Sequence, residues 1–252
     1  MINIEHVSCG YDLNPIIKDI SFTVKENEIL CILGPNGCGK TTLLRAISGL
    51  LPATGTIRMN GMNIKTAGRR EIAKKIAVMN QLTSIYFSYT VYETVKMGRY
   101  VHSKGGIFQT DQKKEKAFVY ECLDKVGMLD QKDRLITELS GGQLQRALFA
   151  RVLAQDPEII LLDEPTNHLD LKYQIELLEQ IKEWGKKENR CVIGVLHDIN
   201  HALLFADKIM LLNDGQIKAY DDSCDFDLTS LNDIYGIDVG DYMLHALERW
   251  RI

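Results

Sequence analysis

A glycine-rich loop near the N-terminus has the composition of a phosphate-binding site. Residues 34–41 read Gly-Pro-Asn-Gly-Cys-Gly-Lys-Thr and match the pattern G-x-x-x-x-G-K-[ST]. Glycines let backbone N–H groups turn inward toward phosphate oxygens without an intervening Cβ. An apolar run precedes the loop and a helical pattern follows it, as this chemistry requires. We therefore expect Lys40 to reach the β- and γ-phosphates of a nucleoside triphosphate, and the Thr41 hydroxyl to ligate Mg²⁺.

Two adjacent acids follow a second apolar run, Ile159-Ile160-Leu161-Leu162. A buried parallel strand has such a continuous apolar sequence, and ligands gather at the carboxyl ends of parallel strands. Asp163 is placed there to hold magnesium. Glu164 comes one residue later and is placed to orient and deprotonate an attacking water. Without the phosphate loop upstream, the same pair would be interpreted as exposed acids at a helix start.

A third motif, Leu139-Ser140-Gly141-Gly142-Gln143, precedes a helical pattern that runs to about residue 153. Ser140 and Gln143 have the S-x-x-Q spacing of a capping box. A well-capped helix is the simplest interpretation of this spacing. Two consecutive glycines would also leave the helix N-terminus accessible to an anion, so the motif is a candidate for a second phosphate contact.

The elements that must position these motifs alternate between strand and helix patterns. Strands are expected at residues 16–24, 28–33, 56–59, 159–162 and 191–196, and helices at 41–50, 141–153 and 175–188. From about residue 82 to residue 157, the apolar residues have the spacing of helices. Asp214-Gly215 predicts a hairpin turn, followed by a less regular tail. The two ends of the chain therefore predict an α/β layer, and the middle a helical insertion.

These motifs, in this order, resemble those of the ATP-binding cassette (ABC) family. The remaining family motifs are then identified by the resemblance. Tyr11 is similar to the aromatic residue that stacks on adenine, and Gln81 to the glutamine that joins core and insertion and touches magnesium and water. Residues 167–170, Asn-His-Leu-Asp, resemble the loop that signals across the dimer. His197 resembles the switch histidine that contacts the γ-phosphate. Each of these residues taken alone would be interpreted as an ordinary surface or strand-end residue.

The resemblance implies an α/β fold: a P-loop NTPase core, with a RecA-like parallel sheet and an antiparallel β subdomain, plus an inserted helical subdomain. It implies one cassette over residues 1–252, with the core at 1–81 and 157–252 and the helical subdomain at 82–156. It also implies ATP and Mg²⁺ as cofactors and a head-to-tail homodimer. ATP contacts within one subunit would be made by Tyr11, Gly34, Pro35, Asn36, Gly37, Cys38, Gly39, Lys40, Thr41 and Thr42. Contacts from the neighbouring subunit would come from Ser140, Gly141, Gly142, Gln143 and Asp170. The catalytic residues would be Glu164, His197, Gln81 and Lys40, and the metal ligands Thr41, Gln81 and Asp163.

A finer resemblance covers residues 90–102, Thr-Val-Tyr-Glu-Thr-Val-Lys-Met-Gly-Arg-Tyr-Val-His. This segment is similar to one in importers of iron–siderophores, haem and cobalamin, although Val101 stands where that subgroup usually has proline. Leu144 likewise stands where arginine is common. Transport of another substrate, export, and a non-transport ATPase such as one in iron–sulfur assembly remain open. A purely regulatory ATP-binding protein is disfavoured by Glu164 and His197.

Composition limits the partners and the location. The formal net charge of −4 gives no global attraction for nucleic acid, so no nucleic-acid partner is expected. The six cysteines are scattered without C-x-x-C spacing, which is typical of reduced cytosolic thiols. The sequence contains neither a recognisable signal peptide nor an apolar run of the ~18 residues that span a bilayer. We expect a cytoplasmic protein, peripheral on the inner face of the cell membrane.

Such a protein must use a partner protein to couple ATP hydrolysis to transport. The expected partners are integral membrane permease subunits and, indirectly, an extracytoplasmic substrate-binding protein. Aromatic residues are concentrated directly after Gln81, between Tyr86 and Tyr100, and aromatic residues are enriched in interface cores. We therefore expect the permease to dock beside Gln81. Within the phosphate loop, Lys40 and backbone N–H groups are expected to favour the Cys38 thiolate and make it the most reactive thiol.

Overall fold

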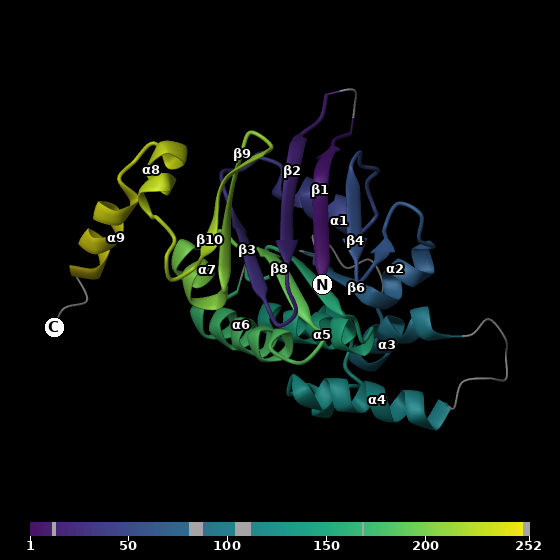
Figure 1. Cartoon of the computed structure of the whole chain (residues 1–252). Helices are drawn as coiled ribbons and strands as arrows, with labels where there is room; N and C mark the ends of the chain where they lie inside the picture. The colour runs from purple at the N-terminus through teal and green to yellow at the C-terminus, as the bar shows by residue number, and fades with distance from the viewer. Residues whose placement is uncertain (12–13, 81–87, 104–111, 168, 249–252) are drawn as a thin grey trace. The chain divides into compact units, whose positions relative to one another are not determined.

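The computed structural model describes residues 1–11, 14–80, 88–103, 112–167 and 169–248 (Figure 1). The chain divides into two compact units. Unit 1 comprises Met1, Lys25–Asn27 and Thr66–Gly194, and unit 2 comprises Ile2–Val24, Glu28–Lys65 and Val195–Ile252.

Unit 2 contains an antiparallel sheet and a parallel strand pair. The antiparallel sheet has the order β2-β1-β4-β5, and in the second group β9 lies between β10 and β3. The strands of unit 2 are β1 (Ile2–Cys9), β2 (Ile17–Val24), β3 (Ile29–Leu33), β4 (Thr56–Met59), β5 (Met62–Asn63), β9 (Lys208–Asn213) and β10 (Gln216–Asp222). β3 and β9 are parallel, with Cys31 opposite Ile209. The expected hairpin joins β9 to β10, and both turn residues, Asp214 and Gly215, have positive φ.

The helices of unit 2 are α1 (Lys40–Ile47), α7 (Ile199–Phe205), α8 (Thr229–Tyr235) and α9 (Val239–Glu248). The expectation of a less regular tail after the Asp214-Gly215 hairpin is wrong, because α8 and α9 follow β10. The sequence analysis did not predict α9, whose apolar residues are mostly exposed. Tyr242, Leu244 and Leu247 are all exposed.

Unit 1 combines parallel strands with helices. Its strands lie in the order β8-β7-β6, and β6 pairs with β7 in parallel, with Asn80 opposite Asp163. These strands are β6 (Ile76–Asn80), β7 (Ile159–Asp163) and β8 (Cys191–Val195). The helices are α2 (Arg69–Lys75), α3 (Val91–Lys96), α4 (Gln112–Lys125), α5 (Gly141–Ala154) and α6 (Leu171–Gly185), with short 3₁₀ turns η1 (Met97–His102), η2 (Leu129–Gln131) and η3 (Ile136–Glu138). The expected mixture of a parallel sheet, an antiparallel sheet and helices is confirmed.

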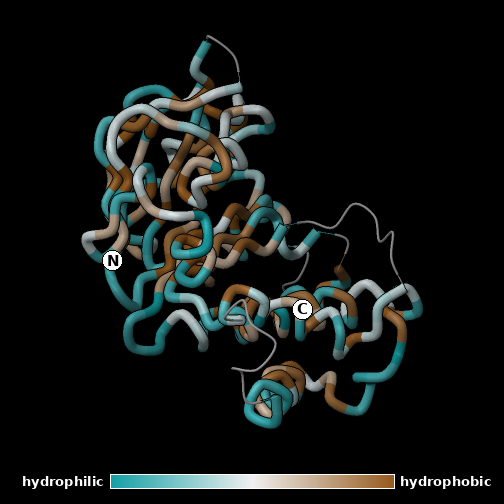
Figure 2. Tube along the Cα trace, turned by 90° about the vertical axis from the view of Figure 1, so that its right-hand side faces the viewer, coloured by the Kyte–Doolittle hydropathy of each residue, from teal (hydrophilic) through white to brown (hydrophobic). Residues whose placement is uncertain are grey.

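Continuous apolar strands form the core of each unit. Every residue of β3 and of β8 is buried, as the uninterrupted apolar runs predict for strands covered on both faces. Figure 2 shows how hydrophobic and hydrophilic stretches alternate along the trace of the chain. Among the described residues, no helix is long and apolar enough to cross a membrane.

Candidate nucleotide-binding site

The glycine-rich loop of unit 2 has the backbone that its sequence predicts. It joins β3 to α1, and Gly34, Gly37 and Gly39 all have positive φ, at 148°, 80° and 111°. A Cβ at Gly34 would collide with the carbonyl oxygen of Leu212 on β9. Only glycine combines this φ with this approach of another strand. The loop shape thus depends on a strand nearly 180 residues later in the chain.

Lys40 points back into this loop from the first residue of α1. Its Nζ donates hydrogen bonds to the carbonyl oxygens of Gly34, at 2.7 Å, and Pro35, at 2.9 Å. The residue is only 6% exposed. Neighbouring Thr41 is half-buried and Thr42 is buried. A buried ammonium beside the helix N-terminus gives the loop a positive centre, which suits a polyphosphate.

Tyr11 follows β1, two residues after the strand ends at Cys9 in unit 2, and 53% of its surface is exposed. The Arg45 side chain, from the last turn of α1, donates a 2.5 Å hydrogen bond to the Tyr11 hydroxyl. Its guanidinium carbon lies 5.9 Å from the centre of the Tyr11 ring. An exposed ring held at its hydroxyl could stack on a base. The sequence analysis missed Arg45, because its spacing from Tyr11 carries no local signal.

A second residue missed from the sequence is Tyr235, at the end of α8. Burial raises the pKa of its phenol, and a hydrogen bond with the Gly34 backbone partly offsets this rise. α8 therefore contributes a side chain to the glycine-rich loop. No local pattern in the sequence indicated this contact, because Tyr235 and Gly34 are far apart along the chain.

The expectation that its surroundings favour the Cys38 thiolate is wrong. Burial raises the pKa of Cys38, and this effect outweighs the lowering by Lys40 and by backbone hydrogen bonds. Burial also raises the pKa of Cys9 and Cys122, to about 11 in both cases. Of the six cysteines only Cys224 is exposed. Proximity to a lysine was visible in the sequence, whereas the depth of burial was not.

We therefore expect limiting iodoacetamide near neutral pH to label Cys224 first. Raised pKa values at the buried thiols lower their thiolate fraction, and the thiolate is the nucleophile. Peptide mass spectrometry at short times measures the order of labelling. Cys224→Ser should abolish the fast phase, whereas Cys122→Ser should leave it unchanged. Faster labelling of Cys38 than of Cys224 would contradict this prediction.

The acidic pair lies in unit 1, at the end of β7 and the start of the following loop. Asp163 is the last residue of the strand and is half-buried. Glu164 has φ of 55°, in the left-handed region, which costs a non-glycine residue about 1–3 kcal/mol. Such a backbone turns Glu164 away from the strand direction, as expected for two acids with different tasks. Its Oε2 accepts a 2.6 Å hydrogen bond from Asn167 Nδ2.

The capping box at the start of α5 is confirmed. Ser140 Oγ accepts from the Gln143 backbone N–H at 3.3 Å, and Gln143 Oε1 accepts from the Ser140 N–H at 3.0 Å. Ser140 is exposed, and Gly142 is buried. A Cβ at Gly142 would lie 2.8 Å from the ring of Tyr173 on α6, so this glycine is required by packing inside unit 1. Sequence analysis gave it only a ligand role.

The remaining predicted residues divide between the two units. His197 is exposed and belongs to unit 2, whereas Asp170 is the exposed N-cap residue of α6 in unit 1. Gln81 and His168 lie outside the described residues. Unit 2 thus carries the glycine-rich loop, and unit 1 carries the acidic pair and the Ser140 motif.

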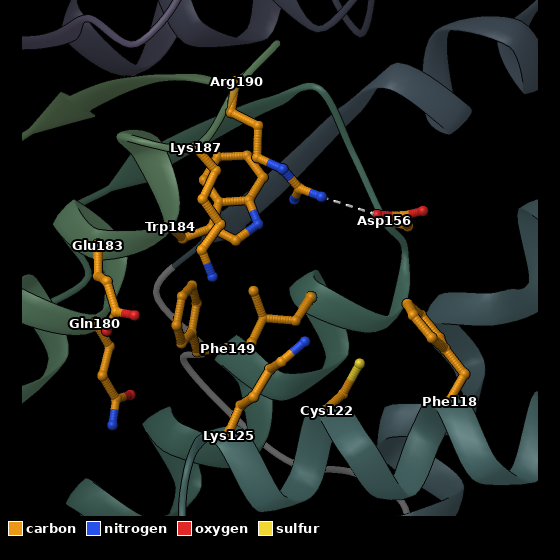
Figure 3. Close-up of a pocket in the computed structure, with 11 residues that line it drawn as sticks. Phe118, Cys122, Lys125, Phe149, Asp156, Gln180, Glu183, Trp184, Lys187 and Arg190 are labelled. Atoms are coloured by element: carbon orange, nitrogen blue, oxygen red, sulfur yellow. Dashed lines mark hydrogen bonds and ion pairs between the residues drawn. The ribbon is translucent and has the colours of Figure 1, made fainter.

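Unit 1 has a cavity of about 290 Å³, lined by residues of α4, α5 and α6 among others. Figure 3 shows these residues. The guanidinium of Arg190 covers the Trp184 ring at 4.6 Å and is paired with Asp156 at 3.2 Å. The Cys122 thiol and Phe149 also line it. None of the residues expected to bind the nucleotide borders this cavity, so it is separate from the candidate site.

Comparison with known proteins gives consistent matches. Residues 17–167 match the family model described as ABC transporter. The chain is 42% identical over 212 residues to the "Uncharacterized ABC transporter ATP-binding protein YvrA" of Bacillus subtilis, covering 84% of this chain but 48% of that protein. It is 39% identical over 219 residues to the "Probable siderophore transport system ATP-binding protein YusV" of the same species, covering 86% and 79%. Its structure matches the dimeric post-hydrolysis ATP-binding cassette MJ0796 bound to ADP and Pi, with a TM-score of 0.76 and 28% identity over 90% of this chain and 100% of that one.

Proposed function

The chain belongs to the ABC transporter family as an ATP-binding, ATP-hydrolysing subunit, and from this premise we propose that it drives import by a membrane permease. The observation that supports the nucleotide site is the glycine-rich loop, where three glycines have positive φ and the Lys40 ammonium donates to the Gly34 and Pro35 carbonyl oxygens. In the proposal, this loop binds the phosphates of ATP and Tyr11 stacks on adenine.

Magnesium fits the proposed donor set. Thr41, Asp163 and Gln81 all offer oxygen atoms, the ligands that Mg²⁺ prefers. Held by these residues, Mg²⁺ would supply positive charge that offsets the negative charge of the phosphates. Glu164 accepts the proton of the attacking water, and His197 orients the γ-phosphate by a hydrogen bond. Lys40 holds the transferred group by its positive charge.

A second copy of the chain completes each site in this proposal. Ser140, Gly141, Gly142, Gln143 and Asp170 of one subunit contact the ATP bound by the other. Ser140 supports this role because it is the exposed N-cap residue of a 14-residue helix, and an anion is favoured at a helix N-terminus. The division into a core and a helical subdomain at 82–156 belongs to the same proposal.

The proposed permease surface lies on the helical part of unit 1. Tyr86 and Phe87, from the expected docking stretch, lie outside the described residues. Tyr89, Tyr92 and Tyr100 line a cavity of about 760 Å³ between the α3–η1 segment and the start of α4. Tyr100 is 80% exposed. Exposed tyrosines at a concave surface fit an interface that receives a short helix of the permease.

The cargo we propose is an iron–siderophore, haem or cobalamin-type chelate. The similarity to YusV and the segment at residues 90–102 support this class. Another transported substrate, export, and a soluble partner in iron–sulfur assembly are the alternatives that experiment must separate.

The test is purification of the tagged protein with its membrane partner, followed by chelate uptake in cells. We expect Tyr100→Glu to weaken permease binding by about tenfold or more, as for a residue at an interface hot spot. ATP binding by the isolated subunit should be unchanged. Tyr242→Glu, an exposed tyrosine on α9, is the matched control and should transport normally.

Normal assembly and uptake by Tyr100→Glu would place the docking surface elsewhere. If a soluble partner co-purifies instead of a permease, the importer proposal fails in favour of the non-transport alternative.

A further inference from the structure

The carboxylate of Glu164 is held by a residue of its own loop. Asn167 Nδ2 donates to Glu164 Oε2 at 2.6 Å, three residues along the chain. The Asn167 backbone N–H also donates to the Glu164 carbonyl oxygen, at 3.4 Å. Both residues are half-buried. The side-chain bond is therefore part of a turn that begins at the left-handed Glu164.

This turn is secured independently from α6. Gln174 Nε2 donates to the carbonyl oxygens of Leu169, at 2.8 Å, and Thr166, at 3.3 Å. The Leu169 backbone N–H donates to the Thr166 carbonyl oxygen at 3.3 Å. Gln174 thus holds the backbone of the loop, whereas the Asn167 amide reaches the Glu164 carboxylate.

We propose that Asn167 is a positioning residue that aims the Glu164 carboxylate at the attacking water. The terminal torsion of a glutamate is broad, so a carboxylate without a fixed donor samples many orientations. A 2.6 Å amide donor narrows this range. The Asn167 amide is neutral. It therefore orients the Glu164 carboxylate without adding a positive charge beside it, which would make the carboxylate a weaker base. This inference rests on the proposed role of Glu164 as general base.

A double-mutant cycle on single-turnover ATP hydrolysis tests the proposal. Asn167→Ala is expected to lower the rate at saturating ATP by about 10- to 100-fold, the cost of a misplaced reacting group. Binding of a fluorescent ATP analogue should stay within about twofold of the unmodified protein. In a Glu164→Gln background, the same Asn167→Ala change should alter the residual rate by no more than about twofold, because no carboxylate base remains to be aimed at the water.

Two further variants separate positioning from general loop damage. Asn167→Asp keeps the shape but loses the donor and places a like charge beside Glu164, so its loss should exceed that of Asn167→Ala. Gln174→Ala loosens the same loop without touching Glu164. Any effect of Gln174→Ala should persist in the Glu164→Gln background.

A rate within twofold of normal for Asn167→Ala would overturn the proposal, as would an equal loss in both backgrounds. Failure of the underlying function has a different readout. If Glu164→Gln alone hydrolyses ATP normally, Glu164 is not the base, whatever Asn167 does.

Discussion

Replacing Glu164 by glutamine is expected to lower ATP turnover by about 10²–10⁴-fold, the usual contribution of a general base. Glutamine is nearly isosteric and keeps an oxygen that can accept the hydrogen bond from Asn167. The loop geometry should therefore survive while the basic group is lost. ATP binding, measured by equilibrium titration, should stay near normal because the glycine-rich loop is unchanged.

The same variant is expected to accumulate as an ATP-bound dimer. Hydrolysis no longer removes the γ-phosphate that joins the two proposed half-sites. Gel filtration with light scattering, in ATP and Mg²⁺, measures the dimer. Glu179→Gln, an exposed acid on α6, is the matched control and should behave as the unmodified protein. A monomeric Glu164→Gln protein with near-normal hydrolysis would disprove the assigned role.

Mixing two inactive variants is expected to restore hydrolysis. Lys40→Ala disables a subunit's own phosphate loop, and Ser140→Arg disables the contact that it offers its neighbour. A heterodimer then has one intact composite site and one site with both defects. Random pairing gives up to about a quarter of normal activity if the two sites act independently. Steady-state phosphate release at equal variant concentrations measures the recovery.

Ser140→Arg also removes the cap of α5, so its effect on folding must be separated. Ser140→Ala loses the same side-chain acceptor, at a cost of about 1 kcal/mol, without adding bulk or charge. Its melting temperature therefore measures the capping contribution. If heterodimers form, shown by two different tags, and the mixture stays as inactive as its components, the head-to-tail arrangement is wrong.

The local motifs could be predicted from sequence because each depends on neighbouring residues. The glycine-rich loop, the Asp214-Gly215 hairpin and the capping box at Ser140 are all present in the structure. Strand β4 has the expected bounds. α6 begins at Leu171, four residues earlier than expected, because Asp170 provides an extended N-cap backbone where the sequence analysis relied on apolar periodicity alone.

Contacts between distant segments could not be predicted in this way. Three contacts of this kind were missed, each between residues that are far apart along the chain. They are Tyr235 with Gly34, Arg45 with Tyr11, and Tyr173 with Gly142. Gly142 illustrates the difference most clearly. From its sequence context, we expected Gly142 to let an anion come close to the helix. The fold shows a second reason for the glycine, because the Tyr173 ring of α6 occupies the space that a Cβ would need.

The sequence by itself determined the chemistry that this protein carries: a lysine in a phosphate loop, adjacent acids after an apolar strand, and a capped glycine pair. These are local patterns, because a turn, a strand end or a helix cap is specified within a few residues. Only the tertiary structure decided the environment of each group. Cys38 shows the reason: neighbouring Lys40 favours its thiolate, but packing by distant elements buries it, and desolvation has the larger effect on its pKa.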